Sequence, residues 1–277
     1  FDHGITHFDL ANNYGPSYGS AEETFGQIMK SSFAPYRDEL FISTKAGHDM
    51  WPGPYGNWGS RKHLMASLDQ SLKRMNLDYV DVFYSHRYDP ETPLEETLQA
   101  LVDIVRKGKA LYVGLSKYPL DAYLFASRYL KERDVPCLLY QGRYSMLVRE
   151  PESQGILNAV KENGSGFVAF SPLAQGLLTN RYLNGIPDNS RIARGGFLKK
   201  EALTPEVLSK IQALNERAAM RGQSLAEMAL AWLLKNETVI SVIVGASSVE
   251  QLGDSLKTLN HLSFEEEELH AIEKILM

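Results

Sequence analysis

The chain has 277 residues, of which 44% are hydrophobic, and a formal net charge of -5 at pH 7. This length and apolar content can bury a large core and suit a globular protein with one barrel-type domain or two smaller ones. No second domain appears along the chain, so we expect a single domain over residues 1–277. The mild acidity, with charges of both signs interspersed, argues against nucleic acid and against a membrane surface as partners.

The pattern of apolar residues predicts strand–helix units around a parallel sheet, because short apolar runs alternate with longer stretches of helical period. Helix starts are indicated by Ser20, by Thr204 before Pro205, and by Ser224 with Glu227 three positions later, which forms a capping box. Seven runs are predicted to be strands, at residues 5–10, 40–45, 79–86, 111–115, 137–141, 167–171 and 240–244.

The single cysteine, Cys137, cannot form an internal disulfide, and its apolar surroundings favour a buried structural thiol over a nucleophile. A reducing compartment suits this composition. The chain shows no signal peptide and no run of about twenty apolar residues, so we expect it in the cytoplasm.

Polar side chains follow the first three predicted strands. Asp9 and Tyr14 follow the first, Lys45 ends the second, and His86 ends the third. In a parallel barrel the carboxyl ends of the strands meet at one mouth, where the chemistry occurs, so we expect these four side chains to lie together.

The four residue types suit proton donation to a substrate oxygen. A tyrosine ordinarily has a pKa of about 10, and a nearby ammonium stabilises its phenolate. Lys45 would serve Tyr14 in this way, with Asp9 as the partner charge of a buried lysine and His86 as a hydrogen-bonding group. Taken singly, Asp9 could instead cap a turn, Tyr14 could be a loop aromatic, and His86 could be a polar residue with no substrate contact.

These segments resemble the Asp-Tyr-Lys-His tetrad of the aldo-keto reductases. The resemblance covers essentially the whole chain through FDLANNYGPSYGSAEETFG, KAGHDMWPGPYG, FYSHRYD, AFSPLAQGLLTNRYLNGIPDNSR and VGASSVEQL. It is greatest to the branch that holds bacterial L-glyceraldehyde 3-phosphate reductases and potassium-channel beta subunits. It implies a (β/α)8 TIM barrel in which a reduced nicotinamide passes hydride to a carbonyl carbon while Tyr14 protonates the oxygen, His86 orients the carbonyl, and Lys45 and Asp9 tune the acid.

The resemblance also implies how NADPH is held, without a glycine-rich dinucleotide fingerprint. Ser116 and Gln141 would bind the nicotinamide carboxamide and Phe170 would stack on the ring. The remaining implied contacts are with phosphates, and they favour NADPH over NADH: Ser171, Leu173, Gly176, Arg181, Ser190, Arg191, Gly245, Ser247 and Gln251. Phe170 could instead belong to ordinary core packing, and each arginine, taken alone, is more often a solvated surface residue.

Two long connections, residues 48–59 and 179–200, are expected to be functional loops. Trp51 in the first is predicted to contact substrate together with His86, although aromatic residues in a Gly-Pro loop can instead anchor that loop. The histidines, including His3 and His7, show no metal-binding spacing, so no metal site is expected.

Three features depart from the family pattern. Lys117 stands after Ser116 where relatives commonly carry a different polar residue, so Lys117 is left out of the predicted site. Asp254 and Ser255 stand where relatives carry Glu-Asn, which weakens any adenine contact there. Only seven strands are present, so we expect the first β/α unit of the barrel to be missing before Phe1.

Two functions follow from the resemblance. The first is NADPH-dependent reduction of small aldehydes, with L-glyceraldehyde 3-phosphate and methylglyoxal as leading substrates. The second is a cofactor-binding regulatory subunit similar to the channel beta subunits. The sequence leaves open whether the chain forms a homo-oligomer.

Overall fold

The structure, a computed structural model of the chain, describes residues 1–183, 185–187 and 198–277. The chain divides into two compact units. The first consists of Phe1–Gln141 with Asn158–Gly166, and the second of Gly142–Leu157 with Phe167–Met277. The single domain expected from the sequence stays a prediction.

The first unit is built on parallel strands that pair in chain order. They are β1 (His7–Asp9), β2 (Phe41–Ala46), β3 (Val80–Ser85), β4 (Ala110–Ser116) and β5 (Cys137–Arg143, of which the part to Gln141 belongs to this unit). Every residue of β3 is buried, as a central strand with both faces covered requires. In the register, Asp9 lies opposite Ser43 and Lys45 opposite Tyr84, so the carboxyl ends of these strands share one edge.

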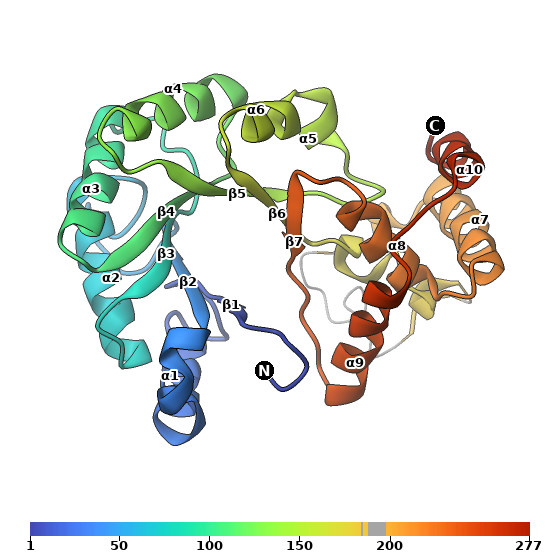
Figure 1. The fold of residues 1–277 in the computed structure, drawn as a ribbon, viewed down its shortest axis with the longest axis horizontal. Coiled ribbons are helices and arrows are strands. Elements are labelled where there is room, and N and C mark those ends of the chain that lie inside the picture. The colour runs from blue at the N-terminus through green and yellow to red at the C-terminus, as the bar shows by residue number, and fades with distance from the viewer. Residues whose placement is uncertain (184, 188–197) are drawn as a thin grey trace. The chain divides into compact units, whose positions relative to one another are not determined.

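Helices cover the outer side of these strands, because parallel neighbours need a crossover connection (Figure 1). They are α1 (Ser20–Ile28), α2 (Arg61–Met75), α3 (Leu94–Arg106) and α4 (Leu120–Lys131), with α6 (Ile156–Glu162, of which the part from Asn158 belongs to this unit) before Gly166. Helix α1 begins at the predicted Ser20, but its cap residue is Gly19, with φ 90°, and no side chain caps it. It packs closely on α2, since a Cβ at Gly26 would lie 2.2 Å from the Arg74 carbonyl oxygen.

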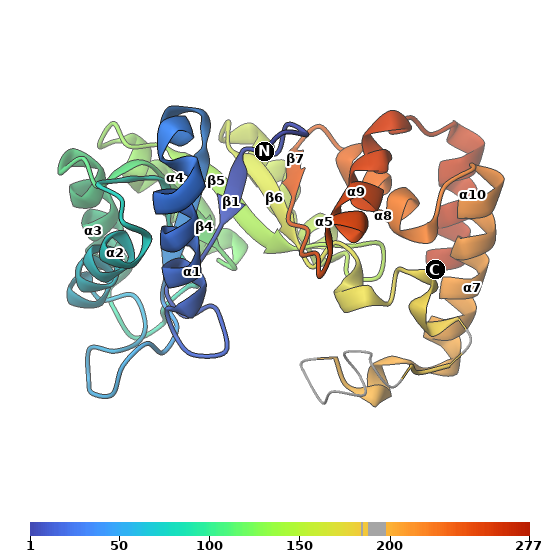
Figure 2. The ribbon, with the colours of Figure 1, turned by 90° about the horizontal axis from the view of Figure 1, so that it is seen from below.

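The second unit holds the parallel pair β6 (Gly166–Phe170, of which the part from Phe167 belongs to this unit) and β7 (Val239–Val242), in which Phe167 lies opposite Val239. Its helices are α5 (Glu150–Ser153), α7 (Pro205–Met220), α8 (Leu225–Leu234), α9 (Val249–Lys257) and α10 (Glu266–Leu276). The predicted capping box at Ser224 and Glu227 is confirmed. Helices α7 and α10 lie side by side (Figure 2). Short helical turns occupy Met29–Phe33, Ala34–Glu39, Ala174–Gly176, Asn180–Tyr182, Lys200–Ala202 and Thr258–Asn260.

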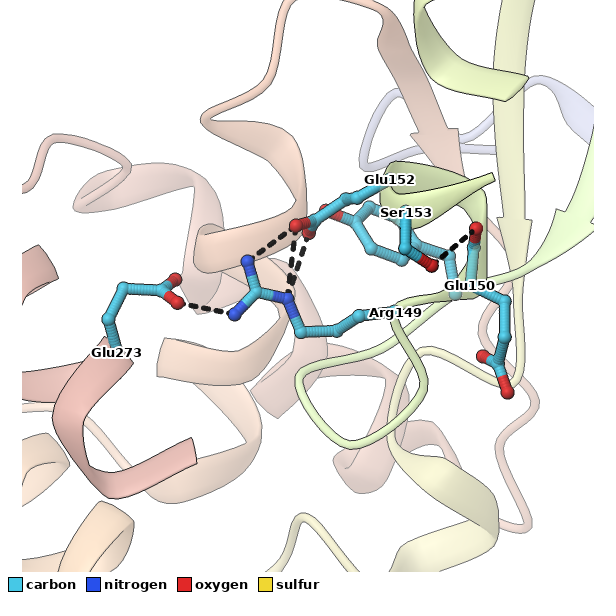
Figure 3. A network of polar contacts seen from close by, with 6 residues as sticks. Arg149, Glu150, Glu152, Ser153 and Glu273 are labelled. Atoms are coloured by element: carbon cyan, nitrogen blue, oxygen red, sulfur yellow. Dashed lines mark hydrogen bonds and ion pairs between the residues drawn. The ribbon is translucent and has the colours of Figure 1, made fainter. Parts of the chain in front are cut away.

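A polar network ties α5 to α10 within the second unit (Figure 3). The Arg149 guanidinium donates to both carboxylate oxygens of Glu152 and, at 2.5 Å, to Glu273 of α10. The Tyr144 hydroxyl also donates to Glu152, and burial together with this carboxylate raises the pKa of Tyr144. The Arg149 guanidinium joins two carboxylates and, through Glu152, the Tyr144 hydroxyl, so we assign the network a structural role.

All seven predicted strands are confirmed among the described residues. The β/α unit expected before Phe1 stays a prediction. Cys137 is free and buried, and burial raises the pKa of its thiol to about 12, which confirms the structural reading. Within the part of the chain that the structure describes, no helix combines the length and apolarity needed to cross a membrane.

Candidate functional site

The carboxyl ends of β1, β2 and β3 bring the four predicted catalytic residues together in the first unit. Asp9 ends β1, Lys45 is the next-to-last residue of β2, and His86 follows β3 directly. Tyr14 lies in the turn between β1 and α1, where its amide donates to Ala11 and its carbonyl accepts from Ala21. The strand ends therefore supply three groups and a backbone-braced turn supplies the fourth.

Lys45 and Asp9 form a buried ion pair. The Lys45 side chain is fully buried, and its ammonium lies 2.6 Å from Asp9 Oδ2 and 2.6 Å from the Leu10 carbonyl oxygen. The other Asp9 oxygen, Oδ1, accepts from Ser43 Oγ at 2.8 Å and from Gln141 Nε2 at 2.9 Å. Because buried charges need a partner and further hydrogen bonds, this set fixes the position of the ammonium.

Tyr14 lies against this pair. The Lys45 ammonium is 5.0 Å from the centre of the Tyr14 ring, and the His86 ring meets Tyr14 edge-on with 5.8 Å between ring centres. Tyr14 is half-buried, whereas Lys45 and His86 are buried. A small molecule can therefore approach the Tyr14 side of the cluster from solvent.

His86 is a neutral imidazole in this setting. Burial, followed by the positive charge of Lys45 and then that of Lys117, holds the pKa of His86 far below its ordinary value. Its Nδ1 atom is buried and meets no hydrogen-bonding partner within the described ranges. A neutral ring with an unpaired nitrogen can form a hydrogen bond to a polar substrate atom without adding charge.

Ser116 and Gln141, the predicted carboxamide contacts, lie opposite one another in the register of β4 and β5. The Ser116 hydroxyl is buried and has no partner among the residues that the structure describes. Gln141 uses its amide nitrogen to bind Asp9, a contact that the sequence reasoning missed. A buried hydroxyl without a partner is costly, so Ser116 is a candidate for binding a ligand group.

In the second unit, the segment that follows β6 has unusual backbone geometry. Ser171, Ala174 and Gln175 have φ of 54°, 46° and 60°, and Gly176 has φ of 102°. Non-glycine residues rarely adopt this region, and such strain concentrates at ligand-binding sites. Of the other residues predicted here, Phe170 and Leu173 are half-buried and Arg181 is exposed.

The predicted phosphate contacts near β7 lie at the start of α9. Ser248 caps this helix, and both the amide and the hydroxyl of Ser247 donate to Gln251 Oε1, at 2.8 and 3.0 Å. Gly245 is exposed. Ser190 and Arg191, also predicted to bind phosphate, lie outside the described residues.

The loop at residues 48–59 is fastened to the first unit. The Trp51 ring packs on His63 of α2 with 4.9 Å between ring centres, and the Tyr55 carbonyl contacts His63 Nδ1 at 2.9 Å. A Cβ at Gly56 would lie 1.8 Å from the Trp51 carbonyl oxygen, so the loop requires glycine there. These contacts anchor the loop, and the substrate contact expected of Trp51 stays a prediction.

Comparison with known proteins identifies the family of this chain. The model of the aldo/keto reductase family matches residues 1–277. The chain belongs to that family.

This aldo/keto reductase is similar to reductases and to potassium-channel subunits. It is 57% identical over 279 residues to the L-glyceraldehyde 3-phosphate reductase of Escherichia coli O157:H7, covering 99% of this chain and 80% of that protein. It is 37% identical to a probable voltage-gated potassium channel subunit beta of Arabidopsis thaliana, over 94% of this chain and 79% of that protein. A crystal structure of a thermostable aldo-keto reductase with the inhibitor epalrestat superposes with a TM-score of 0.75 at 30% identity, covering 99% and 83% of the two chains.

Sequence reasoning left two residues of this aldo/keto reductase out of the site. Lys117 lies directly after β4, and His48 lies just after β2. The Lys117 ammonium is 3.0 Å from Nε2 of His48, although the two residues are 69 positions apart in the sequence. The His48 ring in turn meets the ring of His86, one of the predicted catalytic residues, edge-on, with 4.5 Å between ring centres. Both follow predicted strands, so the rule that located the tetrad could also have found them.

Proposed function

We propose that this chain reduces short aldehydes with NADPH, and that L-glyceraldehyde 3-phosphate and methylglyoxal are its leading substrates. The observation that carries the proposal is the buried Asp9–Lys45 pair beneath Tyr14 and beside His86. The 57% identity to an L-glyceraldehyde 3-phosphate reductase supports the choice of substrate class.

The residues present fit a nicotinamide cofactor. In the first unit, the unpaired Ser116 hydroxyl is suited to a carboxamide group. In the second unit, the strained backbone at Ser171–Gly176 and the start of α9 are suited to phosphates. When bound, the reduced nicotinamide supplies the hydride that, with one proton, converts the carbonyl to an alcohol.

The chain's own residues supply the proton and hold the carbonyl. Tyr14 donates its hydroxyl proton to the carbonyl oxygen, and the ammonium of Lys45 stabilises the phenolate that remains. Asp9 positions Lys45 through the 2.6 Å ion pair. His86, kept neutral, forms a hydrogen bond to the same oxygen and so orients the carbonyl.

A preference for NADPH over NADH would come from residues that meet the additional phosphate. Gln251, held at the start of α9 by Ser247, and the arginines Arg181 and Arg191 are the proposed contacts. Arginine suits phosphate because its planar guanidinium can donate two parallel hydrogen bonds.

Replacing Tyr14 by phenylalanine tests the function in the full chain. Tyr14→Phe should lower kcat by about 10²–10⁴-fold with either aldehyde, because it removes the proton donor. The dissociation constant for NADPH, measured by fluorescence titration, should stay within about two-fold, since the ring remains. Tyr112→Phe, at an exposed position of β4, is the matched control and should keep wild-type turnover. Near wild-type turnover of Tyr14→Phe would refute the assignment.

The alternative is a cofactor-binding regulatory subunit, which the relatives described as channel beta subunits suggest. Their identity to this chain is 36–37%, against 56–57% for the reductases, so we favour the enzyme. A wild-type chain that binds NADPH but turns over no aldehyde would favour the alternative. A cytoplasmic location stays a prediction.

A further inference from the structure

Positive groups cluster beside His86 at the same edge of the first unit. Lys117 donates to His48, and His48 packs edge-on against His86. Arg87, the next residue after His86, donates from Nε to the Gly47 carbonyl and from Nη2 to Asn57 Oδ1, and its guanidinium lies 3.6 Å from the centre of the Trp58 ring. The Arg87 head group is therefore held in place by neutral partners.

Lys117 is exposed and Arg87 is half-buried, and neither is paired in the way of the more enclosed cations of the first unit. Lys45, Arg37 and Arg74 each form an ion pair with a carboxylate, at 2.6 to 3.0 Å. Among the described residues, no carboxylate lies within 4.0 Å of the Lys117 ammonium or the Arg87 guanidinium.

Two acidic residues, Asp89 and Asp49, act on the cluster from a distance and form no ion pair with it among the described residues. Asp89 accepts hydrogen bonds from the backbone amides of Gly59, Glu91 and Thr92, which occupy both of its oxygens. Asp49 is exposed, and its influence on His48 is smaller than that of Lys117 or Arg87. Burial lowers the pKa of Arg87, and the charges of Asp49 and Asp89 partly oppose this, but among the described residues neither carboxylate forms an ion pair with Arg87 or Lys117.

Burial and the neighbouring positive charges lower the pKa values of Lys117 and His48. Partial burial, then the charges of Arg87 and Lys45, lower the pKa of Lys117 to about 8. Burial, then the charges of Lys117 and Arg87, lower the pKa of His48 to about 4. An anion among these groups would relieve the repulsion, since opposite charges favour the protonated forms.

We propose that Lys117, His48 and Arg87 form a subsite for the phosphate group of a phosphorylated short-chain aldehyde. This inference rests on the reductase function proposed above. It identifies the part of the site that would select an anionic substrate over a neutral one of similar size.

Each member has a donor to offer. Lys117 uses one ammonium proton for His48 and keeps two. Because Nε2 of the neutral His48 accepts that bond, its ring proton is on Nδ1 and can be donated. Arg87 Nη1 has no acceptor among the described residues. The 4.5 Å between the His48 and His86 rings suits a molecule whose carbonyl and phosphate are only a few bonds apart.

The test compares a phosphorylated with a neutral aldehyde in the full chain with NADPH. For Lys117→Met, kcat/KM for L-glyceraldehyde 3-phosphate should fall about ten-fold or more relative to kcat/KM for methylglyoxal, because a charge-assisted hydrogen bond is lost. Lys117 has φ of 56°, so Lys117→Asn, which suits that backbone, guards against a folding defect and should show the same selective loss. Lys117→Arg should restore much of the preference.

The matched control is Lys107→Met, an exposed lysine before β4 at the opposite end of the strand from Lys117, which should leave the ratio unchanged. Equal losses for the two aldehydes in the Lys117 variants would overturn the proposal. So would a loss confined to NADPH affinity.

A second readout needs no turnover. In the free protein, inorganic phosphate should raise the titration midpoint of the His48 ring, followed by NMR, in wild type and much less in Lys117→Asn. A midpoint that phosphate does not move would overturn the subsite. If wild type reduced no aldehyde, the reductase function would fail, and this titration would still decide whether the subsite binds phosphate.

Discussion

Replacing Lys45 by methionine should destabilise the chain strongly, because it leaves the buried carboxylate of Asp9 without its ion-pair partner. Breaking a buried ion pair by removing one partner costs about 3–5 kcal/mol. Asp9 would keep its hydrogen bonds from Ser43 and Gln141 on Oδ1 but lose the Lys45 ammonium that pairs with Oδ2. We therefore expect the lower end of this range, about 3 kcal/mol.

The assay is urea unfolding at pH 7, with the free energy of unfolding extrapolated to water for wild type and variants. Lys109→Met is the matched control, because it breaks a pair of the same kind with Asp69 whose side chains are 32% and 54% exposed. That change should cost less than about 1 kcal/mol.

A double-variant cycle isolates the pair from the loss of packing. Asp9→Asn combined with Lys45→Met removes both charges, so it should cost less than the sum of the single changes by about 1–3 kcal/mol. Additive costs, or a loss for Lys45→Met no larger than that for Lys109→Met, would refute the reasoning that the pair is the buried support of the site.

Two further predictions concern Ser116 and Lys117. Ser116→Ala should raise the dissociation constant for NADPH by about 2–12-fold, as expected for the loss of one neutral hydrogen bond. The urea midpoint of the free protein should stay unchanged or rise slightly. A lowered midpoint with unchanged NADPH binding would contradict this prediction. For L-glyceraldehyde 3-phosphate, kcat/KM should fall as the pH rises through about 8, because the pKa of Lys117 is lowered to about 8 by burial, Arg87 and Lys45, and only the ammonium form attracts phosphate. Methylglyoxal measured alongside should lack this decline, and a shared decline would assign it to another group.

The strands and the tetrad could be predicted because their signals are local. Apolar runs bounded by breaker residues gave the strand positions, and the rule that strand ends share one edge placed Asp9, Lys45 and His86 together. The helix start at Ser20 was equally local, but its cap was not, since Gly19 adopts φ of 90° without any side-chain bond.

The contacts that escaped prediction depend on tertiary placement. Gln141 binds Asp9 across 132 residues of sequence, and His48 meets Lys117 across 69. The periodicity of apolar residues in the sequence does not predict contacts between residues so far apart. Lys117 was set aside because it departs from the family pattern, although that departure introduces an ammonium group at the edge where the substrate would bind.

The left-handed backbone of Lys117 has an evolutionary consequence. Lysine is strained at φ of 56°, whereas asparagine and glycine adopt this region at lower cost. A single-nucleotide change converts a lysine codon into an asparagine codon, so mutation can remove the ammonium and relax the backbone in one step. Given the anion subsite proposed above, a lineage could drift toward neutral aldehydes without a stability barrier, and only continued selection for a charged substrate would keep lysine in place.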